Sequence, residues 1–229
     1  MKLFLTSVRT CVDQIPELKN LIKRDTKLIV LPFSYHKDYI NCAKDIYNHF
    51  DRNPYNPDSI FYETVRPFID AGIDVDNIVI MNPYDTPTDY MIYRITRENT
   101  IVYLPGGFPE NIVENIKKFK LSLAIHYAQV IVGESAGSMA PFASFFVYQD
   151  QDYKRYKSYK GLDIIKQRMT VIPHYTKDNK NIEKACRRFH RLNPRTDIYL
   201  IEDGGYIYMN EYRIMKMHKT YIWRRRFII

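Results

Sequence analysis

One pentapeptide, Gly133–Gly137 (Gly-Glu-Ser-Ala-Gly), has the residue types of a serine nucleophile. It follows the mostly β-branched run Gln129–Val132 and precedes small, helix-compatible residues. A buried strand, a tight turn and a helix form a nucleophile elbow, in which the glycines permit the turn and the serine hydroxyl is exposed at its apex. The pattern predicts Ser135 as the nucleophile and the Ala136 N–H as a donor to an oxyanion. The alternative is a structural turn.

A serine nucleophile needs a base, and the chain has six histidines. His174 closes a strand predicted over Gln167–Pro173, which would place it at the same edge of the sheet as Ser135, and we favour it over a merely structural histidine. His36, near the end of an earlier strand, is a weaker candidate. Surface or capping roles suffice for three histidines within predicted helices, which are His49, His126 and His190, and His218 lies in a terminal strand.

The sequence leaves several candidates for the carboxylate that would orient the base. Glu202 and Asp203 follow the apolar run Ile198–Ile201. Because neighbouring strand residues point to opposite faces, only one of the two can serve. Asp150 and Asp152 are further options, although a solvated loop suffices to explain them.

A second glycine pair, Gly106 and Gly107, follows the predicted strand Thr100–Leu104. These residues offer another backbone N–H to an oxyanion, and a plain tight turn is the alternative. Ligands of α/β sheets bind at the carboxyl ends of strands, so this turn and the serine elbow are expected at one site.

The elements that must position these residues alternate along the chain. This alternation predicts an α/β fold with a doubly wound, mostly parallel sheet flanked by helices. Antiparallel strands joined at Asn210-Glu211 are expected near the C-terminus, and Gln149–Lys160 is predicted to be a mobile loop or lid. Predicted strands cover 2–8, 27–33, 76–81, 100–104, 129–132 and 167–173, and predicted helices cover 12–23, 34–50, 59–71, 89–99, 110–127, 179–192 and the segment from the elbow to about Phe145.

Length and composition are ordinary for a soluble protein. The 229 residues predict a single domain, 1–229, with 45% apolar and 26% charged residues. A net charge of +8 invites a nucleic-acid interpretation. Lys and Arg are nevertheless spread along the chain, apart from Arg224–Arg226, and no nucleic-acid motif accompanies them. A solvated basic face is therefore favoured, with some attraction for acidic ligands.

The three cysteines, Cys11, Cys42 and Cys186, are far apart and match no metal-ligand spacing, so neither a disulfide framework nor a metal site is expected. The N-terminal segment turns polar at Ser7, too early for a signal peptide, and no apolar run approaches the length of a membrane helix. A cytoplasmic protein without membrane contact is expected.

The order of these motifs resembles the dipeptidase E and cyanophycinase family of serine peptidases. The similarity covers nearly the whole chain and is strongest from about Ile101 to Met209. The motifs that carry it are Pro-Gly-Gly at 105–107, Gly-x-Ser-Ala-Gly at 133–137, Gly161-Leu162, x-Pro-His at 172–174 and Ile-Glu-Asp-Gly at 201–204.

The resemblance implies a class I glutamine amidotransferase-like fold, with serine where amidotransferases carry cysteine. It also implies that Ser135 is the nucleophile, His174 the base, and Gly107 with Ala136 the oxyanion hole. For the acid it leaves a choice. Cyanophycinase-like members place it in the segment matching 202–204, where motif spacing favours Asp203 and residue identity favours Glu202, whereas dipeptidase E has an aspartate near the position of Asp150.

This chain departs from the family pattern where members often have Gly-Gly-Asn. Here Gly106-Gly107 is followed by Phe108-Pro109-Glu110, so aspartyl-dipeptide cleavage is not assumed.

The prediction is a serine peptidase that hydrolyses small peptides without a cofactor, with a homodimer as an option. An α/β-hydrolase esterase is disfavoured, because only 39 residues separate Ser135 from His174. A non-catalytic, amidotransferase-like binding protein is the other alternative.

Overall fold

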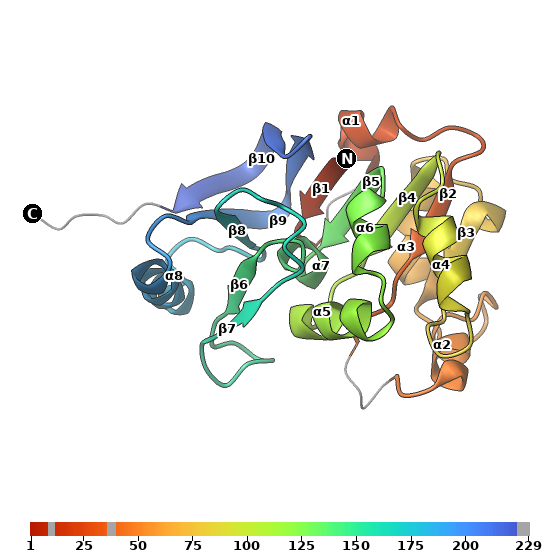
Figure 1. Ribbon diagram of the computed structural model, residues 1–229, viewed down its shortest axis with the longest axis horizontal. Helices are drawn as coiled ribbons and strands as arrows, with labels where there is room; N and C mark the ends of the chain where they lie inside the picture. Colours follow the sequence, from red (N-terminus) through yellow and green to blue (C-terminus); the bar gives the residue numbers. More distant parts are fainter. Residues whose placement is uncertain (9–11, 36–39, 224–229) are drawn as a thin grey trace, which may run out of the picture.

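A twisted sheet runs through the middle of the molecule, with helices against both faces (Figure 1). The computed structural model describes residues 1–8, 12–35 and 40–223. Within them, eight strands form the main sheet in the order β10-β9-β1-β5-β4-β2-β3, with β8 pairing to β9. The sheet is parallel from β1 to β3, and β9 and β10 are antiparallel, so the predicted fold class is confirmed.

Apolar strands form the parallel part of the sheet, as expected where helices cover both faces. β6 and β7 form a separate antiparallel pair. The strands are β1 Lys2–Thr6, β2 Lys27–Val30, β3 Ile78–Ile80, β4 Thr100–Leu104, β5 Val130–Glu134, β6 Ser144–Val147, β7 Lys157–Lys160, β8 Met169–Ile172, β9 Asp197–Asn210 and β10 Arg213–Trp223.

The helices are short, apart from α8 and two others of ten residues. They are α1 Pro16–Lys19, α2 Ala43–His49, α3 Phe61–Asp70, α4 Thr88–Ile95, α5 Pro109–Lys118, α6 Ser122–Tyr127, α7 Ala136–Met139 and α8 Lys180–Leu192, with 3₁₀ turns at Val12–Gln14 and Val75–Asn77.

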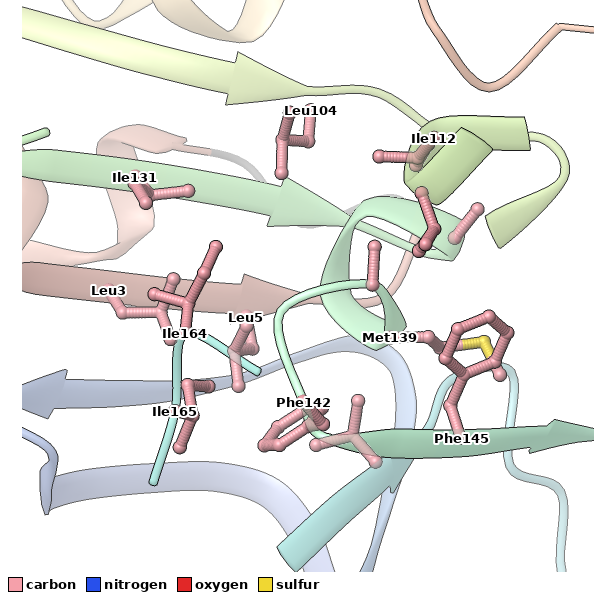
Figure 2. Packing of buried hydrophobic residues seen from close by; sticks show 14 of the residues in the cluster. Leu3, Leu5, Leu104, Ile112, Ile131, Met139, Phe142, Phe145, Ile164 and Ile165 are labelled. Atoms are coloured by element: carbon pink, nitrogen blue, oxygen red, sulfur yellow. The ribbon is translucent and has the colours of Figure 1, made fainter. Parts of the chain in front are cut away.

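Strand side chains alternate between two buried cores, one on each face of the sheet. Phe4, Val30 and Val132 face α1, α2 and α3. Leu5 and Ile131 face the opposite core, which α4 to α8 cover. Figure 2 shows part of this second core, where Met139 of α7 lies beside Phe145 of β6.

Three predicted boundaries are wrong. The helix after the elbow ends at Met139 rather than near Phe145, since Pro141 cannot donate a helical hydrogen bond and the aromatic residues after it form β6. The helix expected from Ser34 begins only at Ala43, and residues 36–39, including the candidate His36, lie outside the described residues. The helix expected over 12–23 is divided at Pro16 into a 3₁₀ turn and α1.

The long strand β9 connects three parts of the sheet. Its second half pairs antiparallel with β1, through Tyr206 and Thr6, and its first half pairs parallel with β8, through Leu200 and Ile172. β8 therefore runs toward the carboxyl ends of β1 and β5 from the opposite direction. Glu202 and Asp203 do not end a strand, as the sequence suggested, but lie inside β9 where it passes the end of β1.

The positive charge is unevenly distributed along the chain. Residues 154–223 contain 16 Lys and Arg against 7 Asp and Glu, whereas residues 1–153 contain 15 against 19. Acidic residues occur at a similar frequency in both parts, whereas basic residues are concentrated after residue 153, so the expected even spread of Lys and Arg is wrong. Within the described ranges, no helix is long and apolar enough to cross a membrane.

Candidate active site

The serine elbow has the strained geometry expected of a nucleophile. Ser135 lies between β5 and α7 with φ 49° and ψ −110°, a conformation that non-glycine residues rarely adopt. Its N–H donates to the Thr6 carbonyl oxygen at 2.9 Å. The buried Ser138 hydroxyl lies 2.6 Å from the same oxygen and 2.7 Å from the Gly133 carbonyl oxygen, so contacts with β1 and β5 hold the elbow in place.

The glycines of the elbow are required by close backbone contacts. A Cβ on Gly137 would collide with the Leu104 carbonyl, and one on Gly133 would collide with the Gly137 carbonyl. Both glycines therefore allow α7 to pack directly against the ends of β4 and β5, which is what fixes the direction of the Ser135 hydroxyl.

Gly137→Ala is expected to lower the free energy of unfolding by about 3 kcal/mol, because the backbone must shift to admit a methyl group. Urea denaturation measures the change. Gly72→Ala is the control: a Cβ there meets no atom within 4 Å, but φ is 108°, so only a backbone cost of about 1–2 kcal/mol is expected. Equal losses in the two variants would contradict the steric explanation.

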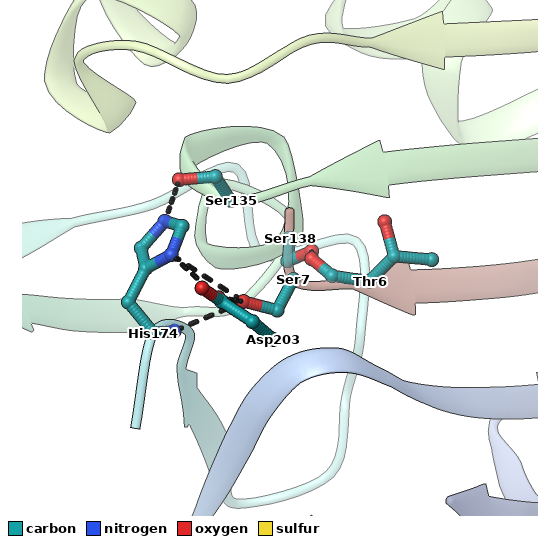
Figure 3. A network of polar contacts seen from close by, with 6 residues as sticks. All are labelled: Thr6, Ser7, Ser135, Ser138, His174 and Asp203. Atoms are coloured by element: carbon teal, nitrogen blue, oxygen red, sulfur yellow. Dashed lines mark hydrogen bonds and ion pairs between the residues drawn. The ribbon is translucent and has the colours of Figure 1, made fainter. Parts of the chain in front are cut away.

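Three of the predicted residues form a continuous chain of polar contacts (Figure 3). The Ser135 Oγ lies 2.7 Å from His174 Nε2, and His174 Nδ1 lies 3.0 Å from Asp203 Oδ1. The His174 and Asp203 side chains are 37% and 41% exposed, so the arrangement opens to solvent. This is the order of contacts that a serine nucleophile, its base and an orienting acid require.

The backbone at the end of β8 directs His174 toward the serine. His174 has φ 57°, in the left-handed region where histidine is enriched among non-glycine residues. The next residue, Tyr175, donates its N–H to the Ile201 carbonyl oxygen at 2.9 Å and so attaches the turn to β9. One strand pairing thus positions both the histidine and the nearby Asp203.

The structure brings Asp203 to His174 and leaves the other candidate acids elsewhere. Glu202 faces Tyr221 of β10, and the charge of this carboxylate raises the pKa of the tyrosine hydroxyl. Asp150 Oδ1 accepts the backbone N–H groups of Asp152 and Tyr153 at 2.9 and 2.8 Å, which stabilises a turn.

Ser7, for which no role is predicted from the sequence, is also part of this network. Its hydroxyl donates to Asp203 Oδ1 at 2.8 Å and accepts the His174 N–H at 3.0 Å. The residue is fully buried directly after β1. The position of Ser7 in the sequence could have indicated a role in the site, because a polar residue that follows a parallel strand lies at the edge of the sheet where ligands bind.

The Gly106-Gly107 turn lies against the elbow. A Cβ on Gly106 would be 3.4 Å from the Ser135 Cβ. Gly107 has φ 132° and packs so tightly on Ser34 that a Cβ would approach its carbonyl oxygen to 2.7 Å. The Phe108 N–H donates to that oxygen at 2.8 Å, and the Ser34 hydroxyl donates to the Gly106 carbonyl. The turn is therefore held beside Ser135.

Comparison with known proteins agrees with this geometry. The sequence profile of peptidase family S51 matches residues 52–217, which include Ser135, His174 and Asp203. The chain belongs to peptidase family S51. It is therefore a serine-type peptidase by family, and the predicted relationship to dipeptidase E is confirmed.

Two solved structures share the fold of this S51 peptidase. A candidate peptidase E from Listeria monocytogenes EGD-e aligns with a TM-score of 0.58 and 14% identity, over 97% of this chain and 98% of the other. A peptidase from an acI-B1 Actinobacterium aligns with a TM-score of 0.57 and 16% identity, over 91% and 83%. No curated protein matches the sequence.

The segment predicted to be a lid is tied to α5 in this S51 peptidase. Part of it is strand β7, which contradicts the prediction of a loop throughout. The Tyr153 and Tyr159 hydroxyls donate to the two oxygens of Glu110, at 2.8 and 3.0 Å. The Tyr153 ring also contacts Phe108 edge to face, with centroids 5.8 Å apart. The segment thus packs beside the Gly106-Gly107 turn.

The other four histidines that the structure describes form aromatic contacts and no hydrogen bond with Ser135. His49 contacts Tyr35 and Phe50 in aromatic pairs, and His190 and His218 contact Trp223 and Tyr206. His126 lies in α6 beside Tyr127. Among residues 1–8, 12–35 and 40–223, no group of three or more His, Cys, Asp or Glu is arranged to hold a metal ion.

Proposed function

We propose that this S51 peptidase hydrolyses small peptides through a Ser135–His174–Asp203 triad. The observation that carries the proposal is the unbroken series of contacts from the serine hydroxyl through the imidazole to the aspartate, at 2.7 and 3.0 Å.

In this mechanism His174 Nε2 accepts the Ser135 proton as the hydroxyl attacks the peptide carbonyl. Asp203 holds the proton on Nδ1, which leaves Nε2 free to act as the base, and it stabilises the imidazolium that forms. His174 then gives the proton to the leaving amine, and a water molecule releases the acyl group by the same steps in reverse order.

The backbone N–H groups of Gly107 and Ala136 are proposed to stabilise the oxyanion. Ala136 is the first residue of α7, where N–H groups have no partner within the helix. The Gly107 turn contacts the elbow, which supports a shared space between the two donors. Fixed donors around a developing charge are commonly the largest contribution to catalysis.

The segment Gln149–Lys160, which contains Tyr153 and Tyr159, supports a preference for short substrates. Its attachment to Glu110 and its contact with Phe108 limit the space next to the Gly106-Gly107 turn. A long polypeptide would have to displace these contacts, whereas a short peptide would not.

We expect the protein to cleave di- and tripeptides faster than it cleaves a peptide of about 15 residues with the same scissile bond. Mass spectrometry of the products measures both rates, with Ser135→Ala as the blank. Cleavage of simple esters with no cleavage of any peptide would contradict a peptidase. Faster cleavage of the long peptide would contradict the size preference.

A further inference from the structure

A second carboxylate, Glu134, lies next to the nucleophile and takes no part in the proposed triad. It is the last residue of β5. Its Oε2 accepts a hydrogen bond from the Tyr103 hydroxyl at 2.6 Å. Tyr103 is buried in the core on the α1–α3 face of the sheet. Glu134 is therefore anchored by one oxygen in a fixed position beside Ser135.

The other oxygen of Glu134 has no hydrogen-bond partner among residues 1–8, 12–35 and 40–223. Among the described residues only Tyr103 donates to this side chain, and no Lys or Arg forms an ion pair with it. Glu134 is partly exposed, and Oε1 is not one of the buried polar atoms without a partner. The Glu134 carboxylate thus has an unoccupied acceptor oxygen on a partly exposed residue.

The Glu134 carboxyl group is partly buried, and the net effect of its surroundings is to raise its pKa above the ordinary value. Burial raises the pKa of this carboxyl group, while the Tyr103 hydrogen bond and the electrostatic influence of His174 lower it. Tyr35, whose phenol is also close enough to be affected by the Glu134 charge, is neutral in its ordinary state. Partly buried charges are normally paired, and a cationic group of a bound molecule would provide a partner for the Glu134 carboxylate.

We propose that Glu134 binds a cationic group of the peptide substrate, either the α-ammonium of the residue whose carbonyl Ser135 attacks or a basic side chain of that residue. The inference rests on the proposed function, because it assigns a role to Glu134 in the same site. The α-ammonium is only two bonds from the attacked carbonyl carbon, and Glu134 is directly adjacent to the attacking residue.

The uneven charge of the molecule fits this assignment. The excess of Lys and Arg lies in residues 154–223, whereas Glu134 and Asp150 belong to the part in which acidic residues outnumber basic ones. The overall charge of +8 is therefore carried by residues after 153, and the part of the chain that contains Glu134 has a net negative charge.

Four fluorogenic amides test the inference by separating the two sources of charge: alanyl, acetyl-alanyl, acetyl-lysyl and acetyl-norleucyl aminomethylcoumarin. Wild type is expected to prefer alanyl over acetyl-alanyl if the α-ammonium binds, or acetyl-lysyl over acetyl-norleucyl if the side chain binds. Glu134→Gln should raise KM for the preferred cationic amide roughly tenfold or more, with a small change in kcat and little effect on the neutral amides.

Glu98→Gln is the matched control, since Glu98 is an exposed residue just before β4, at the opposite edge of the sheet. It should leave KM for all four amides unchanged.

Equal wild-type rates for each charged and neutral pair of amides would overturn the inference, and this comparison needs no variant. Equal losses on charged and neutral amides in Glu134→Gln would also overturn it. Labelling of Ser135 by a neutral fluorophosphonate separates the two proposals: labelling without charge preference defeats only this inference, and absence of labelling defeats the proposed function.

Discussion

Replacing Ser135 by alanine is expected to lower kcat by roughly 10⁶-fold, the loss typical of serine peptidases that lose their nucleophile. The Ser135 hydroxyl is the atom that contacts His174 Nε2, and no other described serine hydroxyl contacts this nitrogen. Covalent labelling by a fluorophosphonate, followed by mass spectrometry of the labelled peptide, measures the effect independently of the substrate.

Ser122→Ala is the control for this experiment, because Ser122 is an exposed residue at the start of α6. It should be labelled as fast as wild type. The fold is expected to persist in Ser135→Ala, since alanine removes only the hydroxyl and the Ser135 N–H that bonds Thr6 remains. Labelling that persists in Ser135→Ala would contradict the assignment of the nucleophile.

Asp203→Asn is expected to lower kcat by about 10⁴-fold with little change in KM. The asparagine N–H group can donate a hydrogen bond to His174 Nδ1. This favours the imidazole tautomer with its proton on Nε2, which cannot act as a base at that nitrogen. Steady-state kinetics on the best amide substrate measures the loss.

Glu202→Gln is the matched control for the acid. It makes the same chemical change one residue earlier on β9, where the side chain faces Tyr221, and we expect activity within about twofold of wild type. A large loss in Glu202→Gln with a small one in Asp203→Asn would reverse the assignment. The pair therefore tests the choice that motif spacing and residue identity leave open.

The parallel half of the fold could be predicted because each element is defined by local sequence. The strand Thr100–Leu104 agrees at both ends, since an apolar run is followed at once by Pro105. The segment after Met139 could not be predicted, because a short apolar run fits either a helix or a strand. Its pairing with β7, which has exposed and polar residues, supplies the deciding information.

In the candidate site, too, features defined by local sequence could be predicted, and features that depend on long-range strand pairing could not. Ser135 and His174 belong to local motifs and could be named from sequence. The choice of Asp203 over Glu202 depends on where β9 passes the end of β1, which is a property of strand register between residues about 200 positions apart. Ser7 could not be identified for the same reason, since its hydroxyl contacts Asp203 and His174, which lie far along the chain.

The pairing of β9 with β1 has a consequence for synthesis of the protein. Ser135 and His174 leave the ribosome before Asp203, and β1 has a partner on only one edge, β5, until β9 has been made. The Ser7 hydroxyl likewise cannot form its hydrogen bond to Asp203 until β9 has been made. A growing chain can therefore possess Ser135 and His174 while Asp203 is absent, so if the proposed triad is correct, hydrolysis should begin only once the last third of the polypeptide has folded against the first strand.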